Sequence, residues 1–285
     1  MHTPTFQTQP PSTAFTRLSY PAPNVLLVTL SRPRQLNCIN GAGQQELHQV
    51  WVWMDAEPSL RIGIITGEGR AFCAGADLKE WDQIASSSGP RPNRRLNTSG
   101  FGGLSRRRGK KPIVAAVNGI AHGGGCEMIA NCDIVLASPS AVFALPEVKR
   151  GVVAIAGALP RLARAIGRMR AMEMALTGRN VGAEEAKAWG LCNAICQKDG
   201  DGLAVEGGVV QLAVQWADEI GKYSPDSVIV SKEGVELGWE GIGVEEGSQR
   251  LIDGLWKRIE GGENMTEGIR AFVEKRNARW VDSKL

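Results

Sequence analysis

The sequence predicts an α/β domain followed by a helical carboxy-terminal region. Two observations carry this prediction. Four short segments are nearly continuous in apolar and branched residues, which is typical of strands covered on both faces of a sheet, and segments with helical patterns separate them. The last third of the chain contains only helix-favouring segments with glycine-containing breaks. A chain of 285 residues can bury a sizeable core.

The first 20 residues are rich in Ser, Thr and Pro, and no acidic residue precedes Glu46, so we expect a disordered arm over residues 1–20. The core is expected over residues 21–202. Its strands are predicted at residues 25–30, 61–66, 112–118 and 133–137, and its helices at residues 44–54, 127–131 and 156–177.

Within this core, residues 82–111 combine Ser, Gly and Pro with the basic runs RPNRR and RRRGKK. This composition predicts a mobile basic loop, which is either solvated or in contact with phosphate groups. The helical region is expected over residues 203–285. Its helices are predicted at residues 203–220, 225–237, 244–260 and 266–281.

Composition excludes several classes of protein. A hydrophobic share of 43%, a charged share of 22% and a net charge of +3 describe a globular protein and make nucleic acid an improbable partner. No apolar run reaches the roughly 20 residues that span a bilayer, so no membrane partner is expected. The six cysteines are scattered and the chain has three histidines, so we expect reduced, structural thiols and no metal site.

The carboxy-terminal tripeptide predicts a cellular address. Ser283, Lys284 and Leu285 spell SKL, which the peroxisomal import receptor reads. We therefore expect a peroxisomal protein. A mitochondrial location is the alternative, because the amino-terminal stretch has some features of a transit peptide.

Two loops rich in small residues could bind an anionic oxygen. In AHGGGCE, residues 121–127, three glycines follow an apolar run and precede an expected helix, so that a ligand could touch outward-pointing backbone amides. GEGRAFCAGADLKEW, residues 67–81, has the same character. Neither matches a dinucleotide or P-loop pattern. If amides of both loops converge, they would stabilise an oxygen that becomes negative during a reaction.

Two glutamates accompany these loops. Glu127 ends the glycine-rich stretch, and Glu147 follows a proline in ALPEVKRG, residues 144–151. A pair of acids whose environments set their pKa values apart can work as general acid and base.

The order AFCAGADLKE, AAVNGIAHGGGCE, DIVLAS and FALPEVKRG resembles the crotonase superfamily of enoyl-CoA hydratases and isomerases, and is most similar to its two-glutamate hydratases. The resemblance implies a spiral of ββα units and a helical carboxy-terminal region that builds trimers, often paired into hexamers. It also implies an acyl-coenzyme A thioester as substrate, with no separate cofactor.

By position, Ala76 and Gly124 resemble the residues whose amides hold the thioester oxygen. Glu127 would activate water for attack at C3, and Glu147 would protonate C2 of the resulting enolate; dehydration reverses these steps. Two alternatives stay open: an isomerase that shifts the double bond with Glu147 alone, and a non-catalytic RNA-binding or scaffold protein that uses the RRRGKK run.

Further residues resemble the family's coenzyme A contacts. They come from SRPRQLN, from the segment after CAGA and from AFVEKR: Arg34, Gln35, Asp77, Leu78, Lys79, Phe272 and Lys275. The chain departs from the family where residues 153–158 replace a glycine-rich run and place bulk near the acyl pocket. A branched or hydroxylated acyl group is therefore as compatible with the sequence as a straight-chain one. The sequence does not decide between hydration and dehydration as the direction of the reaction.

Overall fold

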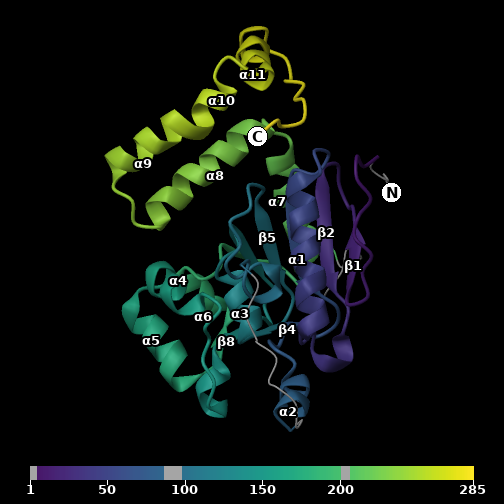
Figure 1. Ribbon diagram of the computed structural model, residues 1–285, viewed down its shortest axis with the longest axis vertical. Helices are drawn as coiled ribbons and strands as arrows, with labels where there is room; N and C mark the ends of the chain where they lie inside the picture. The colour runs from purple at the N-terminus through teal and green to yellow at the C-terminus, as the bar shows by residue number, and fades with distance from the viewer. Residues whose placement is uncertain (1–4, 87–97, 200–205) are drawn as a thin grey trace.

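The computed structural model describes residues 5–86, 98–199 and 206–285. Its centre is a spiral in which successive strands alternate between two sheets (Figure 1). β3 (Ile62–Gly67), β5 (Ile113–Val117) and β7 (Ile134–Ala137) enter one sheet, and the strand that follows each enters the other. This alternation confirms the predicted α/β spiral of ββα units.

The larger sheet has the order β1-β2-β3-β5-β7-β10, and only the β1–β2 pair is antiparallel. Its remaining strands are β1 (Thr16–Ser19), β2 (Val25–Leu30) and β10 (Ala194–Ile195). The four strands expected from the sequence are present, with ends within one residue of the prediction. All residues of β2, β3 and β5 are buried, as their continuous apolar character indicated.

The smaller sheet has the order β4-β6-β8-β9. Its strands are β4 (Ala71–Cys73), β6 (Ile120–His122), β8 (Val142–Ala144) and β9 (Val181–Gly182). β4, β6 and β8 run parallel, so the segments that follow them leave from the same edge of the sheet. These segments carry the CAGAD, GGG and PE sequences.

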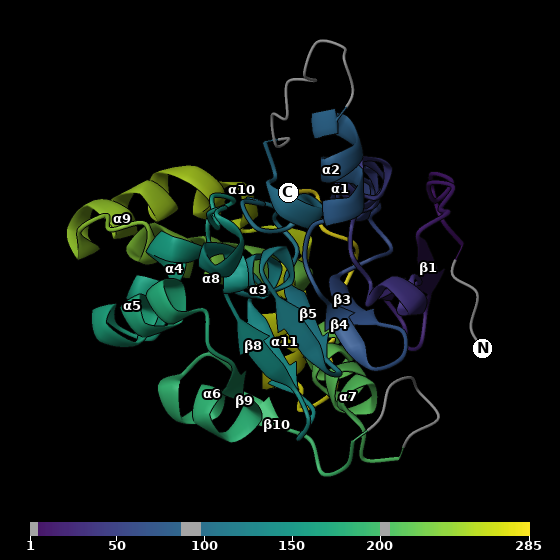
Figure 2. The ribbon, with the colours of Figure 1, turned by 90° about the horizontal axis from the view of Figure 1, so that it is seen from below.

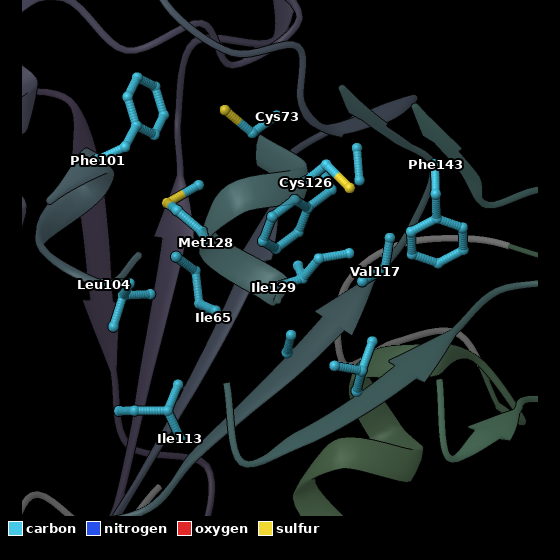
Figure 3. Packing of buried hydrophobic residues seen from close by; sticks show 14 of the residues in the cluster. Ile65, Cys73, Phe101, Leu104, Ile113, Val117, Cys126, Met128, Ile129 and Phe143 are labelled. Atoms are coloured by element: carbon cyan, nitrogen blue, oxygen red, sulfur yellow. The ribbon is translucent and has the colours of Figure 1, made fainter. Parts of the chain in front are cut away.

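The main hydrophobic cluster lies between the sheets and their covering helices. α3 (Gly124–Ile129) is buried along its whole length, and Cys126, Met128 and Ile129 pack with Phe143 and Ile65 (Figure 3). The other core helices are α1 (Gly41–Ala56), α2 (Leu78–Ser86), α4 (Ala158–Ala165), α5 (Arg168–Thr177) and α6 (Ala183–Trp189). α6 packs on β9 and β10 (Figure 2).

Two helix boundaries differ from the prediction for local reasons. α1 begins at Gly41, earlier than expected, because the Asn40 side chain accepts the Gly43 amide at 2.9 Å and caps the first turn. The helix expected over residues 156–177 is instead α4 and α5, since Gly167 separates them with φ +82°.

The carboxy-terminal region is less separate than the sequence predicted. α7 (Val209–Gly221) covers the outer face of the larger sheet and forms a second hydrophobic cluster with β2, β3, β5 and β7. The segments beyond α7 project from the core (Figure 1). They are α8 (Pro225–Trp239), α9 (Val244–Leu251), the π-helix Ile252–Trp256, α10 (Lys257–Ile259) and α11 (Glu263–Val273).

The amino-terminal segment is ordered where we expected a disordered arm. Residues 16–19 form β1, and the buried Glu46 carboxylate accepts hydrogen bonds from the amides of Ala14 and Phe15. Glu57 accepts the amides of Gln7 and Thr8 in the same way. Glu46 on α1 and Glu57 directly after it thus hold in place a segment whose own composition favours disorder.

The predicted mobile loop is also wrong for the described residues 98–111. Phe101, Leu104 and Ser105 are buried, and the 3₁₀ helix Phe101–Gly103 packs on α1. Within RRRGKK, Arg107 pairs with Asp55 at 2.6 Å, and buried Lys111 donates to the carbonyl oxygens of Met54 and Glu57. RPNRR lies outside the described residues.

α11 ends at Val273, whereas the sequence predicted helix to residue 281. Lys275 has φ +54°, and Arg276 donates its amide to the Ala271 carbonyl, which closes the helix. Beyond the helix, the Val281 amide donates to the side-chain oxygen of Asn264 at 2.9 Å, and the side-chain nitrogen of Asn264 donates to the Val281 carbonyl at 3.1 Å. No helix among the described residues is long and apolar enough to cross a membrane.

Candidate active site

The three glycines of the GGG sequence are each required by a close neighbour. Gly123 has φ +54°, and a Cβ there would lie 3.0 Å from Glu147 Oε1. A Cβ at Gly124 would lie 2.6 Å from the Phe101 ring, and one at Gly125 would overlap the carbonyl oxygen of Cys73. The run therefore lets β4, Phe101 and Glu147 approach one backbone turn.

The CAGAD turn meets this backbone directly. A Cβ at Gly75, where φ is +96°, would lie 3.2 Å from the Gly124 nitrogen. Ala76 follows Gly75 and forms a β-bridge with Ile39, in which the Ile39 amide donates to the Gly75 carbonyl and the Asp77 amide donates to the Ile39 carbonyl. The two turns that the sequence predicted to converge do lie together.

The two predicted donors are free to bind an oxygen. Among the described residues, neither the Ala76 amide nor the Gly124 amide donates to another residue, whereas the amides of Gly75, Asp77 and Gly123 do. Gly124 is the first residue of α3, so its amide has no partner within the helix. This pair of amides has the character of an oxyanion hole.

Glu127 is buried on α3, with 4% of its surface exposed. Its carboxylate accepts the Ala158 amide at 3.3 Å, and the amides of Ala156 and Gly157 also interact with it. Burial, and to a smaller extent the Glu147 charge, raise the pKa of Glu127, and the three amides oppose the rise, so that its pKa is about 7.

Glu147 lies in the 3₁₀ helix Pro146–Arg150 that follows β8. Its carboxyl group lies against Gly123, and one of its oxygens, Oε2, is buried without a hydrogen-bond partner among the described residues. Burial raises the pKa of Glu147, while its own backbone amide and Arg150 lower it. The two acids and the two candidate amide donors therefore lie on segments that meet at one turn.

Five predicted coenzyme A contacts gather beside this turn. The Arg34–Gln35 segment and the segment from Asp77 to Lys79 are joined through the Ile39–Ala76 bridge. Arg34, Gln35, Leu78 and Lys79 are exposed. Asp77 instead pairs with Arg32 at 2.9 Å, so the side chain links the two segments. Sequence reasoning missed Arg32, and it likewise missed the buried Asn37, whose side chain bonds to backbone at Arg32, Glu68 and Ala71.

The two carboxy-terminal candidates do not join the site within one chain. Phe272 and Lys275 belong to α11 and its end, which lie at the opposite end of the molecule from α2 (Figure 1). Phe272 is 86% exposed. The prediction that they approach the pocket is therefore not met by a single copy.

The bulk expected near the acyl group also points elsewhere. Val153 and Ile155 are 61% and 74% exposed, whereas Ala154 and Ala156 are buried. The buried positions of residues 153–156 are thus occupied by small residues. The bulky side chains point to solvent and therefore do not argue against any class of acyl group.

Comparison with known proteins places this geometry in a family. The family model for enoyl-CoA hydratase/isomerase matches residues 22–283. The chain belongs to the enoyl-CoA hydratase/isomerase family. It is 50% identical to the mevalonyl-coenzyme A hydratase of Beauveria bassiana, over 99% of this chain and 100% of that protein, and 48% identical to that of Aspergillus fumigatus, over 94% and 95%.

Solved hydratase structures agree. An enoyl-CoA hydratase from Bacillus anthracis superposes with a TM-score of 0.81 at 30% identity, over 95% of this chain and 100% of that one. Membership of the crotonase superfamily is confirmed, and the chain is an enzyme that hydrates acyl-coenzyme A thioesters. The scaffold alternative is wrong, since both acids are in place and much of RRRGKK is bound within the fold.

Burial of Glu127 predicts a pH-dependent stability. Its pKa is raised from 4.5 in the unfolded chain to about 7, so the folded state holds the proton more tightly. Stability therefore falls as pH rises from about 4.5 to 7 and is constant above. Glu127→Gln removes this loss, and we expect the variant to be more stable than wild type by about 3 kcal/mol at pH 8 and similar to it at pH 4.5. Guanidinium unfolding at both pH values measures this.

The control is Glu184→Gln, which removes one charge at an exposed position of α6. A stability difference for Glu127→Gln that is the same at both pH values would contradict a raised pKa.

Proposed function

We propose that this enzyme interconverts a 3-hydroxy-3-methylacyl-coenzyme A of the mevalonyl type and its 2,3-unsaturated product. The observation that carries the proposal is the pair of mevalonyl-coenzyme A hydratases at 50% and 48% identity. Relatives named enoyl-CoA hydratase or carnitinyl-CoA dehydratase match at only 33–37%. Mevalonyl is a branched and hydroxylated acyl group, one of the classes that the sequence left open.

The site supplies a role for each group. The amides of Ala76 and Gly124 bind the thioester oxygen and stabilise the enolate. In dehydration, the Glu147 carboxylate removes a proton from C2, and protonated Glu127 gives its proton to the departing C3 hydroxyl, which leaves as water. Hydration runs these steps in reverse, and no cofactor is consumed.

In the enzyme without substrate, the charges of the site favour the protonation state from which dehydration starts. Both directions need one proton on the pair, on Glu127 for dehydration and on Glu147 for hydration. Glu127 is the more buried acid, and the Glu147 charge raises its pKa. We therefore propose that the shared proton rests on Glu127, although the apparent pKa values belong to the pair.

A direct assay tests this proposal. We expect mevalonyl-coenzyme A to be converted with a higher kcat/KM than 3-hydroxybutyryl-coenzyme A, measured by the absorbance of the conjugated thioester. Glu127→Gln and Glu147→Gln should each lower kcat by about 10²–10⁴-fold, the usual contribution of a general acid or base. Calorimetry with a saturated thioester that has no C3 hydroxyl to eliminate should show retained binding.

Glu184→Gln again serves as the control for charge. Near-normal turnover in either active-site variant would reject the assigned roles, and a preference for the straight-chain substrate would reject the acyl class alone. Retained turnover in Glu127→Gln together with double-bond migration would favour the isomerase.

We also propose that the chain assembles as a trimer or hexamer. The exposed apolar residues Ile269, Phe272 and Val273 on α11 support this, because a single copy leaves them uncovered. In an assembly, Phe272 and Lys275 could reach coenzyme A bound to another copy. Light scattering should give a mass of three or six chains, and Phe272→Glu should lower it or weaken thioester binding. A monomer with full activity would contradict the proposal.

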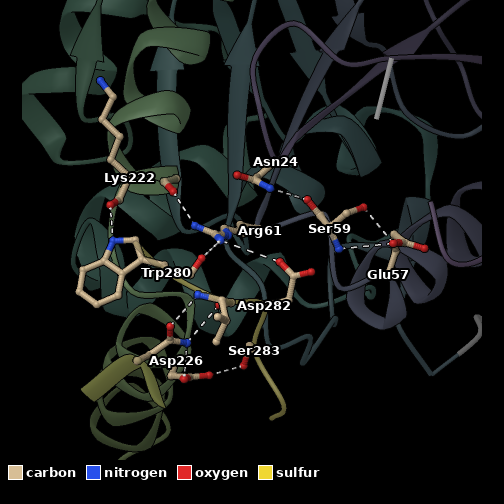
Figure 4. Close-up of polar contacts among 12 residues, drawn as sticks. Asn24, Glu57, Ser59, Arg61, Lys222, Asp226, Trp280, Asp282 and Ser283 are labelled. Carbon is tan, nitrogen blue, oxygen red and sulfur yellow. Dashed lines mark hydrogen bonds and ion pairs between the residues drawn. The ribbon is translucent and has the colours of Figure 1, made fainter. Parts of the chain in front are cut away.

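We propose peroxisomal import through Ser283, Lys284 and Leu285. Ser283 donates to Asp226 at 2.5 Å (Figure 4), and Lys284 pairs with Glu263 at 2.9 Å, so the tripeptide must leave these contacts to be read by a receptor. Fractionation of cells that express the untagged chain should place it in peroxisomes, and deletion of residues 283–285 should release it to the cytosol. Recovery in mitochondria would favour the alternative address.

A further inference from the structure

Ser105 links two parts of the active site. It follows the 3₁₀ helix Phe101–Gly103 and is fully buried. Its hydroxyl group accepts the Phe101 amide at 2.7 Å and donates to the Ala156 carbonyl at 2.7 Å. One small side chain thus joins segments that lie 51 residues apart.

The acceptor end of this link belongs to the turn that contacts Glu127. Ala156 begins the turn whose amides, from Ala156 to Ala158, interact with the Glu127 carboxylate. The turn needs Gly157 at φ +123°, and a Cβ there would lie 2.9 Å from the Ser105 carbonyl oxygen. The hydroxyl group and the backbone carbonyl of Ser105 therefore both lie against this turn.

The donor end reaches the oxyanion hole. Phe101 is 5% exposed, and its ring lies where a Cβ of Gly124 would be. The Phe101 segment has further bonds that do not need this hydroxyl, because the Leu104 and Ser105 amides donate to the Phe101 carbonyl and the Gly102 amide donates to the Gln44 side chain. The contact of Phe101 with Gly124 is therefore held independently of the Ser105 hydroxyl. Among the described residues, the Ser105 hydroxyl group has no hydrogen-bond partner besides the Phe101 amide and the Ala156 carbonyl.

We propose that Ser105 is a positioning residue, whose hydroxyl group holds the 156–158 turn so that its amides orient Glu127 toward C3 of the substrate. The inference rests on the role proposed for Glu127. It assigns to Ser105 an effect on the C3 step, not on proton removal at C2, because Glu147 is held by a different element, the 3₁₀ helix after β8.

Loss of the hydroxyl has a definite physical consequence. Ser105→Ala leaves a buried carbonyl and a buried amide unpaired, which favours relaxation of the turn. The amides then hold Glu127 less well. Glu147 is the charged group that also acts on Glu127, and it remains in place.

The experiment separates the two steps. For Ser105→Ala we expect kcat for dehydration to fall about tenfold or more, with KM within about twofold. Exchange of C2 protons of a saturated acyl-coenzyme A with D₂O, followed by mass spectrometry, needs only Glu147 and the two amides, and should stay within about threefold of wild type. Equal loss in both assays would overturn the proposal in favour of general disruption.

Thr66→Val is the matched control. The buried Thr66 hydroxyl donates to the Ala116 carbonyl at 2.8 Å across 50 residues, so the variant also removes a buried long-range hydroxyl bond, but away from the site. It should leave both assays within about twofold. If Ser105→Ala does not fold, Ser105→Cys replaces the hydroxyl by a thiol, which is a much weaker donor, and should show the same selective loss of dehydration. Unchanged dehydration in a folded Cys variant would reject the proposal.

A double-mutant cycle identifies the partner. When Glu127 is already Gln, Ser105→Ala should lower residual dehydration by less than about twofold. A further loss as large as in wild type would show that Ser105 does not act through Glu127. Full activity in Glu127→Gln would instead reject the role of Glu127, and with it this inference, whereas an inactive Glu127→Gln beside a fully active Ser105→Ala would reject the inference alone.

Discussion

The site depends on the contact of two backbone turns at van der Waals distance. Gly75 and Gly124 approach so closely that a Cβ at Gly75 would lie 3.2 Å from the Gly124 nitrogen. A side chain at Gly75 would press on the turn that carries the Gly124 amide, and one at Gly124 would overlap the Phe101 ring. The parallel arrangement of β4, β6 and β8 makes the contact possible, because the CAGAD, GGG and PE segments all leave the smaller sheet at one edge.

The same close packing governs the charges of the site. Glu127 lies on a helix that is buried along its length, so its ionised form is stabilised mainly by amides from the 156–158 turn. Glu147 lies on a short 3₁₀ helix and is less buried; burial raises its pKa as well, but Arg150 opposes the rise. Two identical side chains therefore differ in the ease with which they ionise, and this difference gives acid and base roles at one pH.

Sequence reasoning succeeded where structure is local or repeats a strand pattern. The apolar runs predicted four of the strands to within a residue, and the three segments CAGAD, AHGGGCE and ALPEVKRG pointed to the candidate amides and acids. It failed where distant groups decide. The amino-terminal segment is ordered by Glu46 and Glu57 of another element, and residues 98–111 are ordered by burial of Phe101 and Lys111. Nothing in the local sequence of Ser105 distinguishes it from a loop serine.

Charge shows the same limit. RRRGKK reads as a phosphate-binding run, yet burial lowers the pKa of Lys111 to about 8 while its ammonium group binds two backbone carbonyls at the end of α1. Arg107 neutralises Asp55 there. These cations tie the segment that carries Phe101 and Ser105 to the core. A basic run beside an active site can thus support the reaction by holding neighbouring residues in position. Its net charge alone does not identify a ligand.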